Sequence, residues 1–331
     1  MVSFVIPVKN DAARLQRCLG SIGRNHGAAL SEILVVDNGS TDDSVAVARA
    51  AGAHVIVVPE GRVAHLRNEG STAARGELLA FVDADHELGA GWLSAAIETM
   101  QPPDVGAAGA LYLAPPDGTW VQRMYGALRG TTVGQSEARW LGSGNLIVRR
   151  GAFEALGGFD VTLESCEDVD FCERLRAAGW RLLADERLVS IHHGDPASLT
   201  KLFRAERWRG RDNLRITLRH GLKPRDVPSV LAPMVIASSF AVVVLAIIAM
   251  AFTRAPALAA LTAAIVAILA LCGLRGLRVA VSGRVRTIGA LTQAIIVGGT
   301  YELARAAAII SRASHHRRHG PYPQTARAPM R

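Results

Sequence analysis

Cysteine is scarce in this 331-residue chain, and its placement excludes two common ways of stabilising a fold. The cysteines show neither the C-x-x-C spacing of a metal site nor a disulfide framework; they are Cys18, Cys166, Cys172 and Cys272. Reduced thiols of this kind are typical of a cytoplasmic catalytic domain. The apolar segment SFVIPV near the start lacks the length and the charged flank of a signal peptide, so none is expected there.

A glycine-rich phosphate loop is also missing after the first expected strand, residues 2–8. The residues Pro7, Val8, Lys9 and Asn10 stand where a G-x-G-x-x-G fingerprint would begin. This absence argues against a dinucleotide-binding site. It also argues against a nucleotidyltransferase, which would need a glycine-rich loop at the same place.

Charged side chains are absent from two stretches, 227–253 and 255–274, on either side of Arg254. About 20 apolar residues suffice for a helix to cross a bilayer, so residues 227–275 are predicted to form a two-helix transmembrane hairpin. Both flanks of this hairpin are basic, with a lysine and arginine cluster at 201–225 before it and Arg275, Arg278, Arg284 and Arg286 after it. By the positive-inside rule, the flanks and the amino-terminal domain lie in the cytoplasm, which predicts a multi-pass protein of the cell membrane.

Residues 288–310 are apolar but carry Glu302 and Arg305. If this segment spanned the membrane, the basic tail at 311–331 would lie outside, against the charge rule. An amphipathic helix in the interface, followed by a flexible tail, is therefore favoured over a third membrane helix. The net charge of +8 includes a basic cluster at 201–225, directly before the hairpin. This position favours membrane lipids over nucleic acid as the partner.

Short apolar runs alternate with helical patterns over the first part of the chain. Such alternation predicts an α/β fold with a parallel, Rossmann-like sheet. The expected strands are 2–8, 32–36, 54–58 and 77–82, and the expected helices are 11–22, 41–51 (capped by Ser40 or Thr41) and 64–74.

Two acids follow the fourth expected strand. Its apolar run ends abruptly in Asp83-Ala84-Asp85, at the strand end where open α/β sheets place their ligands. Two carboxylates one residue apart repel each other unless a cation lies between them, and hard divalent metals take oxygen ligands. The alternative is a solvated turn that happens to contain two acids.

A further acidic cluster is expected at the start of a helix over 166–178. Ser165 is a suitable cap and Gly179 a suitable stop. Asp168 lies in the first turn, where the positive helix end would keep a carboxylate ionised at neutral pH. Glu164, Glu167 and Asp170 crowd the same turn, and helix physics alone does not choose Asp168 over Glu167 as a catalytic base.

Five segments together resemble the family 2 glycosyltransferases over roughly residues 2–220. The segments are SFVIPVKND, EILVVDNGSTDDS, AHLRNEGSTAARGELLAFVDADHEL, GSGNLIVRRGAFEALGGFD and ESCEDVDFCERLRAAGW. The resemblance implies a GT-A fold and transfer of a sugar from a nucleotide donor with inversion at the anomeric carbon. It implies a glycosyltransferase domain over 1–222, with a nucleotide-binding half at about 1–88, an acceptor half at about 89–200 and a basic juxtamembrane helix at about 198–222.

The resemblance also implies roles for individual residues. Asp168 would be the catalytic base, and Asp85 with His193 would bind a divalent metal, Mg²⁺ or Mn²⁺. His192 is an equally acceptable metal ligand by spacing. The implied donor-binding residues are Pro7, Val8, Asn10, Asp37, Arg67 and Asp83, and the implied acceptor-side residues are Gly144, Asn145, Glu167 and Trp208.

Trp208 marks a departure from the processive members of this family. They carry a Q-x-x-R-W motif, and Arg204 stands here in place of the glutamine. This argues for single additions over processive synthesis. The sequence as a whole predicts a membrane-anchored, metal-dependent inverting glycosyltransferase that acts on a lipid-linked or saccharide acceptor. The alternatives are a nucleotidyltransferase and a non-catalytic membrane scaffold.

Overall fold

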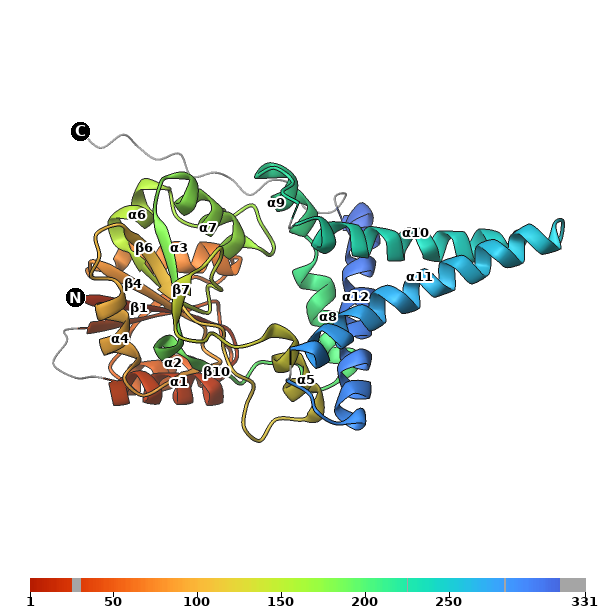
Figure 1. Ribbon diagram of the computed structural model, residues 1–331. Helices are drawn as coiled ribbons and strands as arrows, with labels where there is room; N and C mark the ends of the chain where they lie inside the picture. The colour runs from red at the N-terminus through yellow and green to blue at the C-terminus, as the bar shows by residue number, and fades with distance from the viewer. Residues whose placement is uncertain (26–30, 225, 283, 316–331) are drawn as a thin grey trace.

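The computed structural model describes residues 1–25, 31–224, 226–282 and 284–315, with side chains up to residue 310. Figure 1 shows an α/β domain from which two long helices project to one side, while a further long helix crosses the base of that pair. The expected α/β class is therefore confirmed.

The main sheet has eight strands in the order β3-β2-β1-β4-β8-β6-β9-β7. The first four strands along the chain pair in parallel, as the alternating pattern predicts. β1 is buried along its whole length, which explains its unbroken apolar run. The strands are β1 (Val2–Val8), β2 (Ser31–Asp37), β3 (His54–Val57), β4 (Leu78–Val82), β6 (Val105–Gly109), β7 (Gln135–Glu137), β8 (Asn145–Arg149) and β9 (Arg181–Asp185).

The second half of the sheet departs from the parallel pattern. β8 lies between β4 and β6 and runs antiparallel to both, so the start of β8 lies beside the end of β4. Two short strands leave the main sheet and form an antiparallel ribbon, β5 (His86–Leu88) with β10 (Ser190–His192). The register of this ribbon sets His192 opposite His86, and this pairing positions the site described below.

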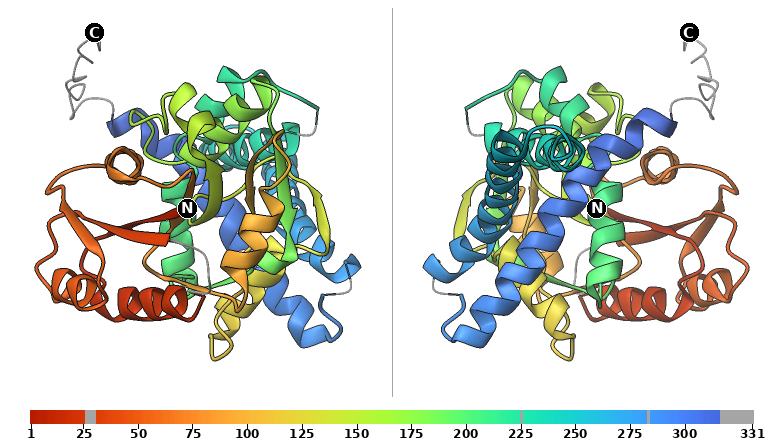
Figure 2. Two further views of the ribbon diagram at one scale, coloured as in Figure 1. Left: turned by 90° about the vertical axis from the view of Figure 1, so that its left-hand side faces the viewer. Right: turned by 90° about the vertical axis from the view of Figure 1, so that its right-hand side faces the viewer.

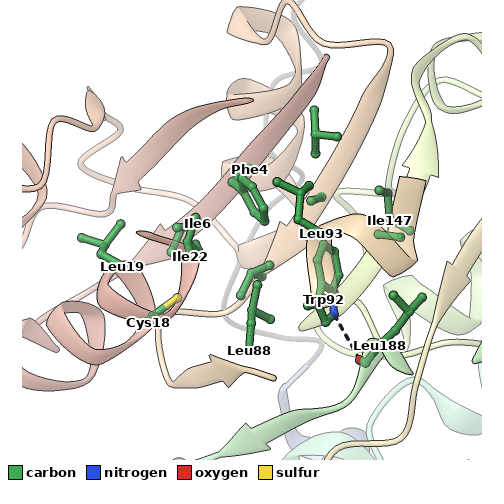
Figure 3. Packing of buried hydrophobic residues seen from close by; sticks show 14 of the residues in the cluster. Phe4, Ile6, Cys18, Leu19, Ile22, Leu88, Trp92, Leu93, Ile147 and Leu188 are labelled. Carbon is green, nitrogen blue, oxygen red and sulfur yellow. Dashed lines mark hydrogen bonds between the residues drawn. The ribbon is translucent and has the colours of Figure 1, made fainter. Parts of the chain in front are cut away.

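Helices cover both faces of the sheet and bury apolar side chains against it. On one face, α1 (Ala12–Asn25) buries Leu19 and Ile22 near Phe4 of β1 (Figure 3). Trp92 joins this cluster and donates its indole N–H to the carbonyl of Leu188 at 3.1 Å. Full burial of an apolar side chain such as that of Ile22 contributes about 1.5–3 kcal/mol to the stability of the fold. The remaining short helices of the domain are α2 (Ser44–Ala50), α3 (Val63–Ala73), α4 (Trp92–Thr99), α5 (Trp120–Arg129), α6 (Arg150–Ala155), α7 (Glu167–Ala177) and the 3₁₀ turn η1 (Glu186–Leu188).

The expected cap of α2 is wrong. The helix begins at Ser44, later than Ser40 or Thr41 would require, and no side chain caps it. The backbone N–H of Ser40 donates to the carboxylate of Asp37, and that of Thr41 donates to Oδ1 of Asn10. Both expected caps are therefore part of the turn between β2 and α2.

The expected cap of α7 is wrong for a related reason. Cys166 holds the capping position with φ of 62°, and its side chain makes no capping hydrogen bond. The Ser165 hydroxyl donates instead to the carbonyl of Arg209, 3.2 Å away in the next part of the chain. The stop at Gly179 is confirmed, since its φ of 87° is the left-handed conformation that ends helices.

The basic helix expected over 198–222 is divided into α8 (Leu199–Arg209) and α9 (Asn213–Arg219). Asp212 lies at the break, and its carboxylate accepts the backbone N–H groups of Glu164 and Ser165. These bonds tie the break to the start of α7, so tertiary contacts override the local helical pattern.

Three long helices follow, α10 (Val227–Ala249), α11 (Arg254–Val281) and α12 (Ile288–His315). Among the described residues, α10 and α11 are long and apolar enough to cross a membrane, and their apolar side chains are largely exposed. α12 runs alongside α8 and contacts both α10 and α11 (Figure 2). The predicted insertion of α12 into the interface stays a prediction, and residues 316–331 of the predicted tail lie outside the described residues.

Candidate active site

A cavity of about 980 Å³ opens between the end of β4, the start of α7 and the long helices. The acidic side chains of Asp83, Glu167 and Asp168 lie in its wall. The helical part of the chain contributes further lining residues, among them Arg275 of α11 and Tyr301 of α12. The cavity thus joins the expected catalytic residues to the candidate membrane helices, although they are far apart in the sequence.

Three side chains beside the cavity could hold a metal ion. Asp85, His86 and His192 each offer one ligand atom, and these atoms all lie within 4.8 Å of one another. Asp85 Oδ2 is 3.3 Å from His192 Nε2, while Asp85 Oδ1 is buried without a hydrogen-bond partner. A buried carboxylate oxygen without a partner is costly, and a cation would satisfy it. The residues present therefore fit a divalent metal.

Burial and neighbouring charges together set the pKa values of these three side chains. Burial alone would raise the pKa of Asp85, but the hydrogen bond and charge of His192 hold it well below its usual value. Burial, followed by the charge of His192, lowers the pKa of His86 to about 4, so its ring is neutral. Burial opposes protonation of His192, but hydrogen bonds to Asp195 and Asp85 raise its pKa to about 9. Without a metal, His192 is the cation beside Asp85.

His193, the metal ligand expected from the sequence, lies outside this group. Its Nε2 is 3.0 Å from Glu87 Oε2, and its Nδ1 is 2.9 Å from a guanidinium nitrogen of Arg17 on α1. His193 lies in the turn after β10, whereas His192 is the last residue of that strand and brings its ring to Asp85. The register of β10 against β5 selects His192.

Arg67 joins the two acidic parts of the site. One guanidinium nitrogen donates to Asp83 Oδ1 at 2.6 Å and another donates to Glu167 Oε1 at 2.8 Å. The side chain is 2% exposed. Arg67 was expected to bind the donor; its guanidinium holds two protein carboxylates in place, and contact with a donor stays a prediction. Ser143 adds a third contact by donating its hydroxyl to Glu167 Oε1 at 3.1 Å.

Asp168 lines the cavity on its α7 side. Its carboxylate accepts from the backbone N–H of Val169 at 2.8 Å and from that of Ser143 at 3.3 Å. Burial, followed by the neighbouring charge of Glu167, raises the pKa of Asp168 to about 7. The expectation that the helix end keeps it fully ionised is wrong, because burial beside a second carboxylate outweighs the helix dipole.

The predicted acceptor-side residues divide into two groups. Gly144 and Trp208 line the cavity, and a side chain at Gly144 would collide with Asp83 and His86. Asn145 is 1% exposed, accepts the Trp92 indole N–H and donates to the carbonyl of Leu188. Asn145 is therefore a buried structural residue beneath the cavity wall, and its hydrogen bonds link Trp92 to Leu188. Glu167 lines the cavity, but its carboxylate is bound by Arg67.

Four predicted donor-binding residues meet at the carboxyl ends of β1 and β2. Asn10 has φ of 51°, and its side chain accepts from the backbone of Thr41. The Val8 carbonyl accepts from the N–H of Asn38, and Pro7 lies opposite Val36. Asp37 is 2% exposed and accepts from Ser40. These residues lie outside the cavity wall as described, and their contact with a nucleotide stays a prediction.

Sequence reasoning missed several residues of the site. His86 follows the acid pair directly, and its type alone was a usable signal. Arg14 of α1 lies 3.8 Å from Asp85 and could have been found from its place after the first strand. No local pattern pointed to the others, because they reach the cavity only through tertiary packing; they are Tyr112, Arg139, Trp140, Arg275, Tyr301 and Arg305.

Comparison with solved structures assigns the fold to the GT-A class. The mannosyltransferase PcManGT from Pyrobaculum calidifontis, solved with GDP-Man and Mn²⁺, superposes with a TM-score of 0.59 at 19% identity, covering 94% of this chain and 86% of that one. GalNAc-T7, solved with UDP, GalNAc and Mn²⁺, superposes with a TM-score of 0.51 at 17% identity, covering 66% of this chain and 47% of that one.

Sequence comparisons give the family. Residues 3–157 match the model described as Glycosyl transferase family 2. Glycosyltransferase AglE of Haloferax volcanii is 28% identical over 215 residues, covering 61% of this chain and 71% of that protein. The pre-mycofactocin glycosyltransferase of Mycobacterium tuberculosis is 30% identical over 254 residues, covering 71% of this chain and 50% of that protein. The chain carries a glycosyltransferase family 2 domain, as its sequence motifs predict.

Proposed function

We propose that this protein transfers a sugar from a nucleotide-diphosphate donor to a lipid-linked acceptor at the cytoplasmic face of the membrane, with inversion at the anomeric carbon. The observation that carries the proposal is the shared cavity. Asp168 lines it together with Arg275 of α11, which is itself a candidate membrane span, and Tyr301 of α12. An acceptor head group held at a membrane surface would have direct access to such a cavity.

The donor end of the site would be organised by a divalent metal. Asp85, His192 and His86 are the proposed ligands, with His192 taking the place first predicted for His193. A bound metal would offset the charge that develops on the departing diphosphate. Arg67 keeps Asp83 oriented beside this group, and its burial prevents the guanidinium from turning elsewhere.

Asp168 is the proposed base at the acceptor end. With a pKa near 7, its carboxylate is partly ionised at neutral pH and basic enough to take a proton from a hydroxyl. The acceptor oxygen would attack the anomeric carbon on the face opposite the leaving diphosphate, which inverts the configuration. Trp140 and Trp208 lie in the cavity wall and offer apolar faces on which a sugar ring can stack.

The donor is tested with the full chain in lipid nanodiscs and a panel of nucleotide sugars, scored for metal-dependent release of nucleoside diphosphate. We expect one or a few donors to be cleaved, Asp85→Asn to abolish cleavage, and Glu87→Gln to serve as a matched control with near-normal activity. Release that is independent of metal, or unaffected by Asp85→Asn, would count against this site.

The acceptor is tested with the donor found in that panel. Polyprenyl phosphate, a lipid-linked saccharide and a soluble saccharide are compared at equal concentration in the same nanodiscs. We expect transfer to a lipid-linked compound to exceed transfer to the soluble sugar. Equal turnover on the soluble sugar would contradict the proposed acceptor class and leave the transferase activity itself supported.

A further inference from the structure

A buried carboxylate, Asp195, lies behind the proposed metal ligands. The side chain of Asp195 is 0% exposed, and its Oδ1 lies 2.7 Å from Nδ1 of His192. The other ring nitrogen of His192, Nε2, faces Asp85. One imidazole thus lies between two carboxylates, one on the metal side and one on the protein side.

We propose that Asp195 is a positioning residue for metal binding: it holds the Nδ1–H tautomer of His192, so that the Nε2 lone pair points at the metal. The inference rests on the metal site proposed above. Metal-binding histidines generally donate their second ring N–H to a carboxylate or carbonyl, which fixes the ring and increases its strength as a ligand. The Asp195–His192–Asp85 arrangement has that order of groups.

The negative charge of Asp195 is compensated independently of any metal. Arg129 of α5 donates two hydrogen bonds to the Asp195 carboxylate, at 3.0 and 2.7 Å. The Arg129 guanidinium in turn lies 3.9 Å from the centre of the Tyr112 ring. Because Arg129 balances its charge, Asp195 can stay ionised and in place whether or not a metal is bound.

The His192 ring is confined from other directions as well. Tyr112 meets it edge to face at 4.8 Å between ring centroids, and His86 lies at 4.6 Å. Gly194 closes the turn, since a side chain there would collide with Asp85 and His192. The His192 ring can therefore change only by flipping about its own axis or by exchanging tautomers. The hydrogen bond to Asp195 restricts both changes.

A purely structural role for Asp195 is the competing explanation, because its bond to Arg129 ties α5 to the chain after β10. The two explanations differ in one respect. A positioning role acts through His192 and disappears when His192 is replaced. A structural role lowers the stability of the fold whatever residue occupies position 192.

The test measures Mn²⁺ binding to the full chain in nanodiscs, in the presence of nucleoside diphosphate, by electron paramagnetic resonance of the free ion. Wild type, Asp195→Asn, His192→Gln and the double variant form a cycle, with thermal unfolding of each metal-free protein measured in parallel. Asp185→Asn is the matched control, since Asp185 is a buried carboxylate that binds Arg187 and Thr99 away from the site.

We expect Asp195→Asn to weaken Mn²⁺ binding about 10- to 100-fold in the wild-type background and hardly at all in the His192→Gln background. Asp185→Asn should leave Mn²⁺ affinity unchanged. Unchanged affinity in Asp195→Asn, or an equal loss in both backgrounds, would overturn the inference. If Asp195→Asn does not fold, Asp195→Glu, which keeps the charge beside Arg129, enters the same cycle. Failure of the wild type to bind Mn²⁺ would instead refute the proposed metal site.

Discussion

Two carboxylates of the candidate site, Asp85 and Asp168, have opposite protonation behaviour. Asp85 lies beside His192, whose hydrogen bond and positive charge hold the pKa of Asp85 well below its usual value. Asp168 lies beside Glu167, and burial with that like charge raises its pKa to about 7. Both side chains are partly buried, so burial alone does not explain the difference. The sign of the neighbouring charge makes the difference: Asp85 stays ionised and can bind a cation, whereas Asp168 can accept a proton near neutral pH.

The largest expected effect comes from removing the proton acceptor. Asp168→Asn should lower kcat by about 10²- to 10⁴-fold, the usual contribution of a general base, while thermal stability changes little. Steady-state kinetics at saturating donor and acceptor measure this loss. Glu164→Gln at the same cavity wall is the control and should retain activity within a few fold. Full activity of Asp168→Asn would remove Asp168 from the mechanism.

The next effect concerns the residue that links the two sides. Arg67→Lys keeps a positive charge but cannot hold Asp83 and Glu167 at once, so both carboxylates should lose their orientation. We expect kcat/KM to fall about 10- to 100-fold, equivalent to about 1.4–2.7 kcal/mol of transition-state stabilisation. The unfolding temperature should fall as well, because a buried pair is broken. Unaltered kinetics would show that Arg67 serves folding alone.

The preference for Mn²⁺ or Mg²⁺ tests the proposed metal ligands around Asp85. Two imidazoles and one carboxylate suit Mn²⁺ and later transition metals better than Mg²⁺, which favours all-oxygen ligands. At equal free concentration, activity with Mn²⁺ should exceed activity with Mg²⁺ by about tenfold. His86→Asn should narrow this gap. A preference for Mg²⁺ would argue that the histidines do not reach the ion.

The smallest effect is a change in the pH profile. A base must be ionised to accept a proton, so kcat/KM should rise with pH up to about 7 and level off above it. Glu167→Gln removes the like charge beside Asp168, which should lower the pKa of Asp168 and move this rise to lower pH. Rates measured between pH 5 and 9 would show the displacement. A profile unchanged by Glu167→Gln would mean that another group titrates.

Local sequence patterns predicted the first half of the sheet well. Strands β1 to β4 and helices α1 to α3 each have the periodicity of their own class, and the acid pair directly follows β4. The two uncharged stretches likewise predicted α10 and α11. These features depend on residues close together in the chain, where burial on one or both faces leaves a direct pattern.

Other parts of the site depended on residues that are distant in the chain. The choice of His192 over His193 came from the register of β10 against β5. The division between α8 and α9 came from bonds between Asp212 and the start of α7. The contacts of Arg67 with Asp83 and Glu167 join residues 16 and 100 positions apart in the chain. No local propensity records such pairings.

The amino-acid sequence by itself determined the class of fold, the family, the acid pair at the end of β4 and the two apolar helices, because each depends on residues that are close together in the chain. Only the tertiary structure decided which histidine reaches Asp85, which charge lies beside Asp168, and that α11 and α12 form a wall of the same cavity. Those outcomes depend on strand register and on burial, and both arise only when distant segments meet.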